Sequence, residues 1–304
     1  MCDYPLLAFD MGVKPDGKRA IKFLSRYDMS FKDAQDKYGE HLLLLPCGHC
    51  PSCVKMYAKT WSVRLMLESL YHSEMCFVTL TFDNYHLPKD VAGVKFEFQK
   101  FLKRLREKFD DRKIRYFGCI ERGGQTKRLH VHFILFGVSF NDAKVFGYNE
   151  LKQPCYTSKV LSDLWPLGFS SFGEVTPESC AYVARYSMKK KLDFSHDDSC
   201  LMMSTHPGIG TQFYLDKKEI LYLSDRVYSS SFHGVSIPRY FDKLAENDPI
   251  VSDMFQKSKE KRLKRGQQLL YNFLITSGSD TFEIANKRKI EDNLKKLYLR
   301  RRDL

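Results

Sequence analysis

The chain has 304 residues, with 49 Lys and Arg against 37 Asp and Glu, and 43% of its residues are hydrophobic. This length and composition allow one large domain or two ordinary ones, and they exclude a disordered chain, a collagen-like repeat and a small disulfide scaffold. No apolar segment approaches the length of a membrane span, and residues 1–4 lack the basic start and long apolar stretch of a signal peptide. Nine cysteines, an odd number, without an export signal indicate reduced thiols in a reducing compartment.

The formal charge is +12, and most of the positive excess lies near the C-terminus. Residues 255–304 contain 14 Lys and Arg but only 6 Asp and Glu. A positive field of this kind attracts polyanions, and nucleic acid or a membrane surface is the usual partner. Charge alone does not choose between them, and solvated helix faces would explain the same basic runs equally well.

The first regular elements are a helix, a strand and a second helix. Residues 54–72 contain no Gly or Pro and have apolar side chains at helical spacing, which predicts a helix. Residues 76–82 are rich in β-branched and aromatic residues and predict a strand. In residues 95–109 an apolar stripe that includes Phe98 runs beside a basic face, which predicts an amphipathic helix.

Further along the chain, the ranges 114–121 and 129–137 are predicted to form a hairpin, because a Gly-Gly pair and a polar loop separate them. A helix near 157–165 and a strand near 169–175 follow. Another helix is expected to begin at Thr176, whose side chain can cap it, and the proline that follows suits its first turn.

This order of elements predicts an α+β fold, with a split βαβ (ferredoxin- or RRM-like) antiparallel sheet and packed helices. Beyond residue 192 Gly, Ser and His become frequent and the periodicity weakens, so we expect a domain boundary there. The expected parts are an N-terminal extension with a cysteine cluster and a helix (1–74), a central sheet domain (75–195) and a basic, helical C-terminal region (196–304) for DNA or partner binding.

His130 and His132 are the first residues that suggest chemistry. Alternate side chains of a strand share a face, so both imidazoles point the same way and can hold one metal ion. The predicted hairpin brings Glu121 across from them, near enough to supply a carboxylate oxygen as the third ligand. An isolated His-x-His is more often a packed or exposed pair, but two His and one Glu with open positions suit a divalent cation that holds a phosphate.

Two tyrosines lie four residues apart on the helix after Thr176. Tyr182 and Tyr186 therefore share a helix face, and Lys189 and Lys190 follow the second tyrosine by three and four residues. A tyrosine hydroxyl has an ordinary pKa of about 10 and is a poor nucleophile at neutral pH, but a nearby cation stabilises the phenolate. The pair suits a DNA strand transferase that must cut twice, although packing alone would also explain this spacing.

Cys47, Cys50 and Cys53 form a C-x-x-C-x-x-C motif whose spacing suits thiolate ligation of a structural zinc. A tetrahedral site needs a fourth ligand, and the sequence does not choose among the candidates. These are His41, His49, Cys76 and Cys2. An iron–sulfur cluster is a second interpretation, and three thiols near a helix start without any metal are a third.

Taken together, these motifs resemble those of a known family. The residues that carry the likeness are, in order, Thr79-Leu80-Thr81 with Tyr85-His86-Leu87-Pro88, Glu121 with His130-Val131-His132, and Tyr182-Val183-Ala184-Arg185-Tyr186 with Lys189-Lys190. Their order and spacing are similar to those of the His-hydrophobe-His rolling-circle replication initiators. The nearest likeness is to the initiators of gokushovirus-type microviruses, which are small single-stranded DNA phages, and a more distant one is to the gene A protein of the isometric coliphages. The cysteine motif with Trp61, Arg64 and Glu68 is also similar to that microvirus group.

The resemblance covers about residues 46–192 and implies that 75–195 are a His-hydrophobe-His endonuclease domain. The implied activity is nicking and rejoining of one DNA strand at an origin. The two histidines and Glu121 would hold Mg²⁺ or Mn²⁺, which polarises the scissile phosphate. One tyrosine would then attack and leave a 5′-phosphotyrosyl protein and a 3′-hydroxyl that primes replication. The second tyrosine would release the completed circle.

Contacts with DNA are expected from basic side chains near these motifs, because phosphate contacts supply most of the affinity. The residues expected to make them are Arg122, Lys127, Arg128 and Lys191. Unpaired bases could stack on aromatic rings such as Tyr85. The expected partners are single-stranded and origin DNA and, because the sequence has no Walker-type loop, a host helicase, with host polymerase and single-strand-binding protein. The implied location is the cytoplasm of the bacterial host, with no membrane contact.

Two other classes of protein remain open at this point. A transposase or relaxase of the same nuclease superfamily would share the chemistry but not the biological role. A non-catalytic nucleic-acid-binding module on a ferredoxin-like sheet would explain the charge and the aromatic residues, but it would leave the histidine and tyrosine pairs as coincidences.

Overall fold

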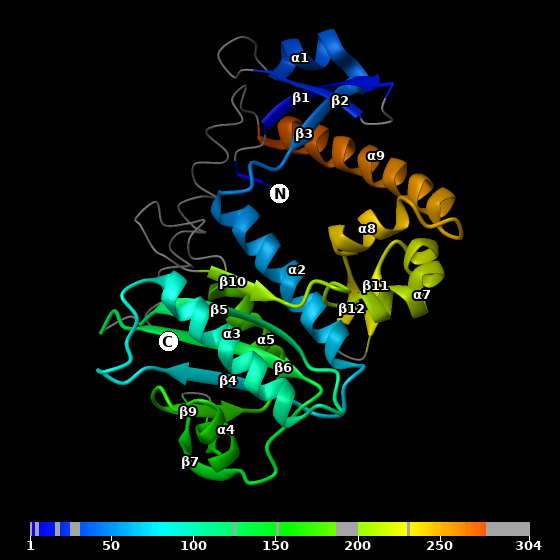
Figure 1. Ribbon diagram of the computed structural model, residues 1–304. Helices are drawn as coiled ribbons and strands as arrows, with labels where there is room; N and C mark the ends of the chain where they lie inside the picture. The colour runs from blue at the N-terminus through cyan, green and yellow to red at the C-terminus, as the bar shows by residue number, and fades with distance from the viewer. Residues whose placement is uncertain are drawn as a thin grey trace. The chain divides into compact units, whose positions relative to one another are not determined.

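The computed structural model describes residues 2–3, 6–15, 19–24, 31–123, 126–149, 152–186, 200–229 and 232–277 (Figure 1). The chain forms two compact units, one made of Met1–Met56 with Asn272–Leu304 and the other of Tyr57–Tyr271. The division into three domains at residues 75 and 195 stays a prediction. None of the described helices is both long and apolar enough to cross a membrane.

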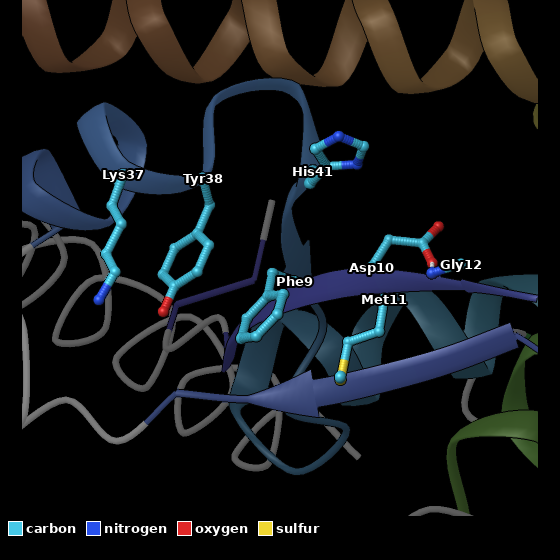
Figure 2. A pocket seen from close by; sticks show the side chains of 7 residues that line it. All are labelled: Phe9, Asp10, Met11, Gly12, Lys37, Tyr38 and His41. Carbon is cyan, nitrogen blue, oxygen red and sulfur yellow. Dashed lines mark hydrogen bonds between the residues drawn. The ribbon is translucent and has the colours of Figure 1, made fainter.

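The first unit contains a small antiparallel sheet in which β1 pairs with both of its neighbours. Its elements are β1 (Leu6–Val13), β2 (Arg19–Phe23), α1 (Phe31–Tyr38), a 3₁₀ turn (Gly39–His41) and β3 (Leu42–Leu45). Phe9 of β1 stacks on Tyr38 of α1, with ring centroids 4.3 Å apart. Beside this pair lies an open hollow of about 530 Å³, which His41 and Lys37 also line (Figure 2). It contains none of the predicted site residues.

The second unit is built on a seven-stranded antiparallel sheet with the strand order β10-β5-β6-β4-β9-β8-β7. The strands are β4 (Met75–Thr81), β5 (Arg115–Arg122), β6 (Leu129–Phe136), β7 (Lys144–Tyr148), β8 (Pro154–Thr157), β9 (Ser170–Gly173) and β10 (Cys200–Met203). The helices associated with it are α2 (Pro51–Ser69), α3 (Val91–Lys108), α4 (Lys159–Leu164) and α5 (Pro177–Tyr186). The predicted α+β fold with an antiparallel sheet and packed helices is therefore confirmed.

Strand alternation gives the two faces of this sheet different roles. On one face Val131 and Phe133 of β6 are fully buried against Phe98 and Phe101 of α3, and the Phe98 and Phe133 rings meet edge to face with centroids 4.9 Å apart. This is the main apolar core, and Figure 1 shows α3 crossing the sheet there. The residues between those positions on β6, including His132, face the opposite side of the sheet. The core thus fixes one face while the other carries the polar side chains.

Side-chain caps set the starts of three helices. Asp90 accepts a hydrogen bond from the Gly93 amide at the start of α3, which begins at Val91, four residues before the predicted position. Ser158 caps α4 in the same way. The predicted cap of α5 is confirmed, because the Thr176 hydroxyl accepts from the Ser179 amide at 3.2 Å.

The remainder of the second unit packs against the middle of α2. Its elements are α7 (Thr211–Ser224), β11 (Val227–Ser229), β12 (Phe232–Val235), α8 (Arg239–Ala245) and α9 (Ser252–Ser277). Val63 and Leu67 of α2 are buried in one cluster with Phe213, Phe241 and Phe255. The basic helix α9 lies within the region where a helical C-terminal part was expected, and residues 278–304 lie outside the described residues.

Gly118 is the position where β5 and β6 approach most closely among the glycines described. A Cβ atom there would lie 2.2 Å from the Cβ of Phe133 and 2.5 Å from the carbonyl oxygen of His132. We expect Gly118→Ala to lower the free energy of unfolding by about 2–3 kcal/mol, because the strands would have to separate. Urea denaturation measures this change. The matched control is Gly147→Ala in β7, where a Cβ meets nothing within 4 Å and the change should stay below about 0.5 kcal/mol. Equal stability losses in the two variants would contradict the close approach.

Candidate metal centre and active site

The pairing register of three neighbouring strands places the predicted metal ligands together. In the β5–β6 hairpin Glu121 lies directly opposite His130. In the β4–β6 pair Thr79 lies directly opposite His132. Since alternate residues share a face, all four side chains project from the same side of the sheet. The predicted hairpin and the predicted position of Glu121 across from the histidine pair are therefore confirmed.

Both imidazoles converge on a single carboxylate oxygen. The Nε2 atoms of His130 and His132 lie 3.0 and 3.3 Å from Oε1 of Glu121. One ligand atom from each residue can be chosen so that all three lie within 4.8 Å of one another. Two imidazole nitrogens and a carboxylate oxygen at this separation can hold a single cation.

The outer nitrogens of the two rings are also engaged. Nδ1 of His130 lies 3.1 Å from the carbonyl oxygen of Arg128, and Nδ1 of His132 lies 2.9 Å from the hydroxyl of Thr79. A carbonyl only accepts, so Nδ1 of His130 carries the proton, and in the neutral ring Nε2 offers its lone pair to Glu121. A lone pair facing a carboxylate requires a positive charge between them. This arrangement fits a bound metal ion, with the carbonyl and the hydroxyl orienting the two ligands.

Burial strengthens the same conclusion. Only 4% of Glu121 and 8% of His132 is exposed. A buried carboxylate is costly unless a cation or several hydrogen-bond donors compensate its charge. Two neutral imidazoles would not compensate it fully, whereas a divalent cation held by all three side chains would.

Tyr182 lies beside this centre. The centroid of its ring is 5.5 Å from that of His132 and 5.9 Å from that of Phe77, and both contacts are edge to face. Phe77 in turn stacks on His132 with centroids 5.7 Å apart. Helix α5 therefore brings the first predicted nucleophile to the face of the sheet that holds the metal ligands. The helix ends at Tyr186, whose side chain lies outside the described residues, as do Lys189, Lys190 and Lys191.

The predicted phosphate-binding residues of the hairpin differ in their surroundings. Lys127 is exposed, and Arg122 is half-buried with its Nη1 atom 3.4 Å from the carbonyl oxygen of Lys127. The guanidinium of Arg128 donates to the side chain of Asn84 and to the carbonyl of Phe82. Arg128 thus ties the hairpin to the loop after β4, and Arg122 and Lys127 have more freedom to meet a phosphate.

Sequence reasoning did not assign a role to Arg64 and Glu68, which the structure places in a buried network. The guanidinium of Arg64 lies between the rings of Trp61 and Tyr240, 4.1 Å from each centroid, and burial lowers its pKa to about 10. Glu68 accepts hydrogen bonds from the Gly210 amide and from Arg115. Burial raises the pKa of Glu68, but these donors, His72 and the Arg115 charge outweigh it and hold the pKa below its usual value. The pair positions α2 and the residues before α7, and it does not reach the metal centre.

The structure also places the cysteine motif. Cys47, Cys50 and Cys53 lie together in the first unit, and Cys2 joins them as a fourth possible ligand. The other three candidates for the fourth ligand, His41, His49 and Cys76, are not part of this group.

Comparisons with known proteins agree with these motifs. A family model described as replication-associated protein ORF2 matches residues 75–191. The replication-associated protein ORF2 of Spiroplasma virus 4 is 30% identical over 273 residues, which are 84% of this chain and 85% of that protein. The replication-associated protein VP4 of Bdellovibrio phage phiMH2K is 33% identical over 79% of this chain and 82% of its own length. The replication-associated protein ORF4 of Chlamydia phage 1 is 26% identical over 81% of this chain and 64% of its own length. No solved structure is significantly similar to the chain.

An α+β protein with a histidine pair and a glutamate on its sheet, facing a tyrosine on a packed helix, has the arrangement expected from the three sequence motifs. The chain belongs to the family of viral replication-associated proteins that these relatives represent. The predicted resemblance to the rolling-circle replication initiators of gokushovirus-type microviruses is thereby confirmed.

Proposed function

We propose that the chain is a metal-dependent, origin-specific single-strand DNA endonuclease and strand transferase that initiates and terminates rolling-circle replication of a small single-stranded DNA phage. One observation carries the proposal: the Nε2 atoms of His130 and His132 meet at one oxygen of Glu121, beside the ring of Tyr182. The names of the relatives favour a role in replication over transposition or conjugation.

The ligand set would be His130, His132 and Glu121, and the ion Mg²⁺ or Mn²⁺. Three protein ligands leave coordination positions for water and a phosphate oxygen. When bound, the ion would supply Lewis-acid polarisation of the scissile phosphate and neutralise charge that develops on it. The hydrogen bonds from the outer ring nitrogens keep both imidazoles oriented for this task.

The covalent step would be carried out by the tyrosines. The hydroxyl oxygen of Tyr182 or Tyr186 attacks the phosphorus and loses its proton, and the bond from phosphorus to the 3′ oxygen breaks. The 5′-phosphate is then bonded to tyrosine, and the 3′ oxygen takes up a proton to become a hydroxyl that primes synthesis. Lys189 and Lys190 would stabilise the phenolate before attack.

Termination would reverse this chemistry after one genome length has been copied. The second tyrosine cuts the regenerated site, and the free 3′-hydroxyl attacks the first phosphotyrosyl bond, which releases a circle and restores the tyrosine. The phosphodiester energy is conserved in the protein linkage, so joining requires no ATP. Host helicase, polymerase and single-strand-binding protein would supply unwinding and synthesis in the cytoplasm of the host cell.

The direct test is formation of a covalent adduct. The full chain is incubated with Mg²⁺ or Mn²⁺ and end-labelled single-stranded DNA of the phage genome that encodes it. The products are then separated under denaturing conditions. We expect a labelled protein band that depends on the added metal ion and disappears after protease treatment. DNA binding without any adduct, at every metal concentration and with every genome fragment, would support the non-catalytic alternative.

Substitution of the carboxylate should give a graded loss. We expect Glu121→Gln to reduce nicking by about 10–100-fold, because an amide oxygen binds a metal ion more weakly than a carboxylate, and Glu121→Ala to reduce it further. The measurement is the initial nicking rate as a function of Mn²⁺ concentration, and part of the Glu121→Gln loss should be recovered at high Mn²⁺. Full activity of Glu121→Ala would show that another group supplies the third ligand. Asp83, a nearby carboxylate in the chain, already pairs with His86 at 2.8 Å.

Basic side chains of the hairpin should contribute to affinity rather than to chemistry. We expect Arg122→Gln and Lys127→Gln each to weaken binding of single-stranded DNA several-fold and to reduce the slope of log affinity against log salt by about 0.7. Fluorescence anisotropy at several salt concentrations gives both quantities. The control is Lys217→Gln, an exposed lysine on α7, which should change neither. Unchanged binding in both hairpin variants would remove the hairpin from the DNA-binding surface.

A further inference from the structure

Four cysteine sulfur atoms come together in the first unit. The Sγ atoms of Cys2 and Cys50 are 3.7 Å apart, and those of Cys47 and Cys53 are 4.0 Å apart. All four Sγ atoms lie within 4.8 Å of one another. A zinc ion bound to four thiolates at about 2.3 Å in a tetrahedron separates its sulfurs by roughly 3.8 Å. The observed separations are therefore close to those of one four-coordinate site.

The backbone around the cluster brings a distant ligand to the motif. Asp3 is fully buried, and its carboxylate accepts hydrogen bonds from the amide and the hydroxyl of Ser52 in the first turn of α2. This capping contact fixes the segment next to Cys2 against the helix start. On the other side of the cluster Gly48 has a φ of +83°, which lets the chain turn sharply between β3 and α2. Residues far apart in sequence are thereby held at one point.

Backbone amides point at the sulfur atoms, which favours thiolates. The N–H groups of Asp3 and Cys53 donate to Sγ of Cys50, that of Cys50 donates to Sγ of Cys47, and that of Cys47 donates to Sγ of Cys2. The donor-to-sulfur distances are 3.3 to 3.4 Å. Hydrogen bonds to a charged sulfur stabilise it, as does the start of a helix. Four sulfurs with such donors are arranged as metal ligands rather than as packed thiols.

We propose that Cys2, Cys47, Cys50 and Cys53 bind one structural zinc ion. Each thiol gives up its proton to solvent on binding, so the site holds Zn²⁺ in four thiolates. The ion joins residues 2–3 and the loop after β3 to the first turn of α2. An iron–sulfur cluster fits less well, because several iron and sulfide atoms between the cysteines would hold the sulfurs farther apart than the ligands of one ion.

The zinc site is independent of the proposed nuclease chemistry, and the experiment keeps the two apart. The full chain is purified with a histidine-free tag at its C-terminal end, dialysed against metal-free buffer, and analysed for metals by mass spectrometry. We expect about one zinc per chain. The double variant His130→Ala/His132→Ala should keep the same content, since a metal at the nuclease centre would otherwise add to the count.

Single substitutions then test the ligands. Cys2→Ser and Cys50→Ser should lose most of the zinc, whereas Cys155→Ser, a partly buried cysteine on β8 outside the cluster, should retain about one equivalent. Retention of zinc by Cys2→Ser would overturn the assignment of the fourth ligand. A natural chain that contains no zinc, that contains iron, or whose cluster cysteines are joined in disulfides would overturn the proposal.

A spectroscopic measurement on the natural sequence covers the case in which the Cys2 variant does not fold. Cobalt in place of zinc should give the sulfur-to-metal charge-transfer bands and strong visible bands of tetrahedral thiolate coordination. Weak visible bands typical of octahedral oxygen coordination would overturn the four-thiolate site.

Discussion

The double substitution Tyr182→Phe/Tyr186→Phe is expected to abolish the covalent protein–DNA adduct, while each single variant still forms one. Phenylalanine keeps the ring that Tyr182 packs against His132 and Phe77, so the fold of the site is preserved and only the hydroxyl is lost. Circle release should fail in both single variants, because termination needs a fresh hydroxyl while the first one holds the 5′ end. The measurement combines denaturing gels for the adduct with an assay for single-stranded circles.

Peptide mapping of the DNA-linked fragment identifies the residue that carries the label. Tyr228→Phe, an exposed tyrosine on β11, is the matched control and should behave like the natural chain. If one single variant loses every adduct and the other is fully active in both assays, the chain uses one tyrosine and the other has a packing role. A label recovered outside residues 180–191 would overturn the assignment of α5 as the catalytic helix.

The metal centre could be predicted from sequence because the features that form it are local. Alternation along one strand places His130 and His132 on one face, and the Gly-Gly loop places Glu121 opposite them in a hairpin. The same applies to the cap of α5, which needs only Thr176 and the amide three residues later. Short-range geometry of this kind leaves little freedom once the element type is known.

Other features depended on contacts between distant residues and gave no sequence signal. Strand β7 lies at the edge of the sheet, and most of its side chains, including Val145, Phe146 and Tyr148, are exposed, so the alternation typical of a half-buried strand is missing. Strand β10 (Cys200–Met203) pairs with β5, and this non-local pairing could not be read from four residues. Each of these strands is defined by its partner rather than by its own pattern.

The fourth cysteine and the buried ion pair show the same limit. Cys2 lies 45 residues before Cys47 in the sequence, and only the contact of Asp3 with the start of α2 brings it to the cluster. Glu68 and Arg115 come from a helix and a strand, and a charged side chain on a helix is expected to be solvated unless its neighbours are known. Spacing identified the motif in both cases, but the fold supplied the partner.

Loss of either histidine should separate chemistry from binding. We expect His130→Ala and His132→Ala each to reduce nicking by more than about 10³-fold, because removal of one of three ligands abolishes the polarisation of the phosphate by the metal ion. Affinity for single-stranded DNA should change less than about threefold, since phosphate contacts by Lys and Arg supply it. The nicking rate and the anisotropy titration are measured on the same preparations.

A positioning variant shows whether the loss arises at the metal. Thr79→Val keeps the shape of the side chain but removes the hydroxyl that contacts Nδ1 of His132 at 2.9 Å. It should weaken the apparent affinity for Mn²⁺ by about 10-fold and leave the rate at saturating Mn²⁺ close to that of the natural chain. The His130→Ala variant should not recover at any Mn²⁺ concentration. Cleavage at the natural rate by either histidine variant would show that the cluster of His130, His132 and Glu121 is a packed polar group, and that the phosphate is activated elsewhere in the chain.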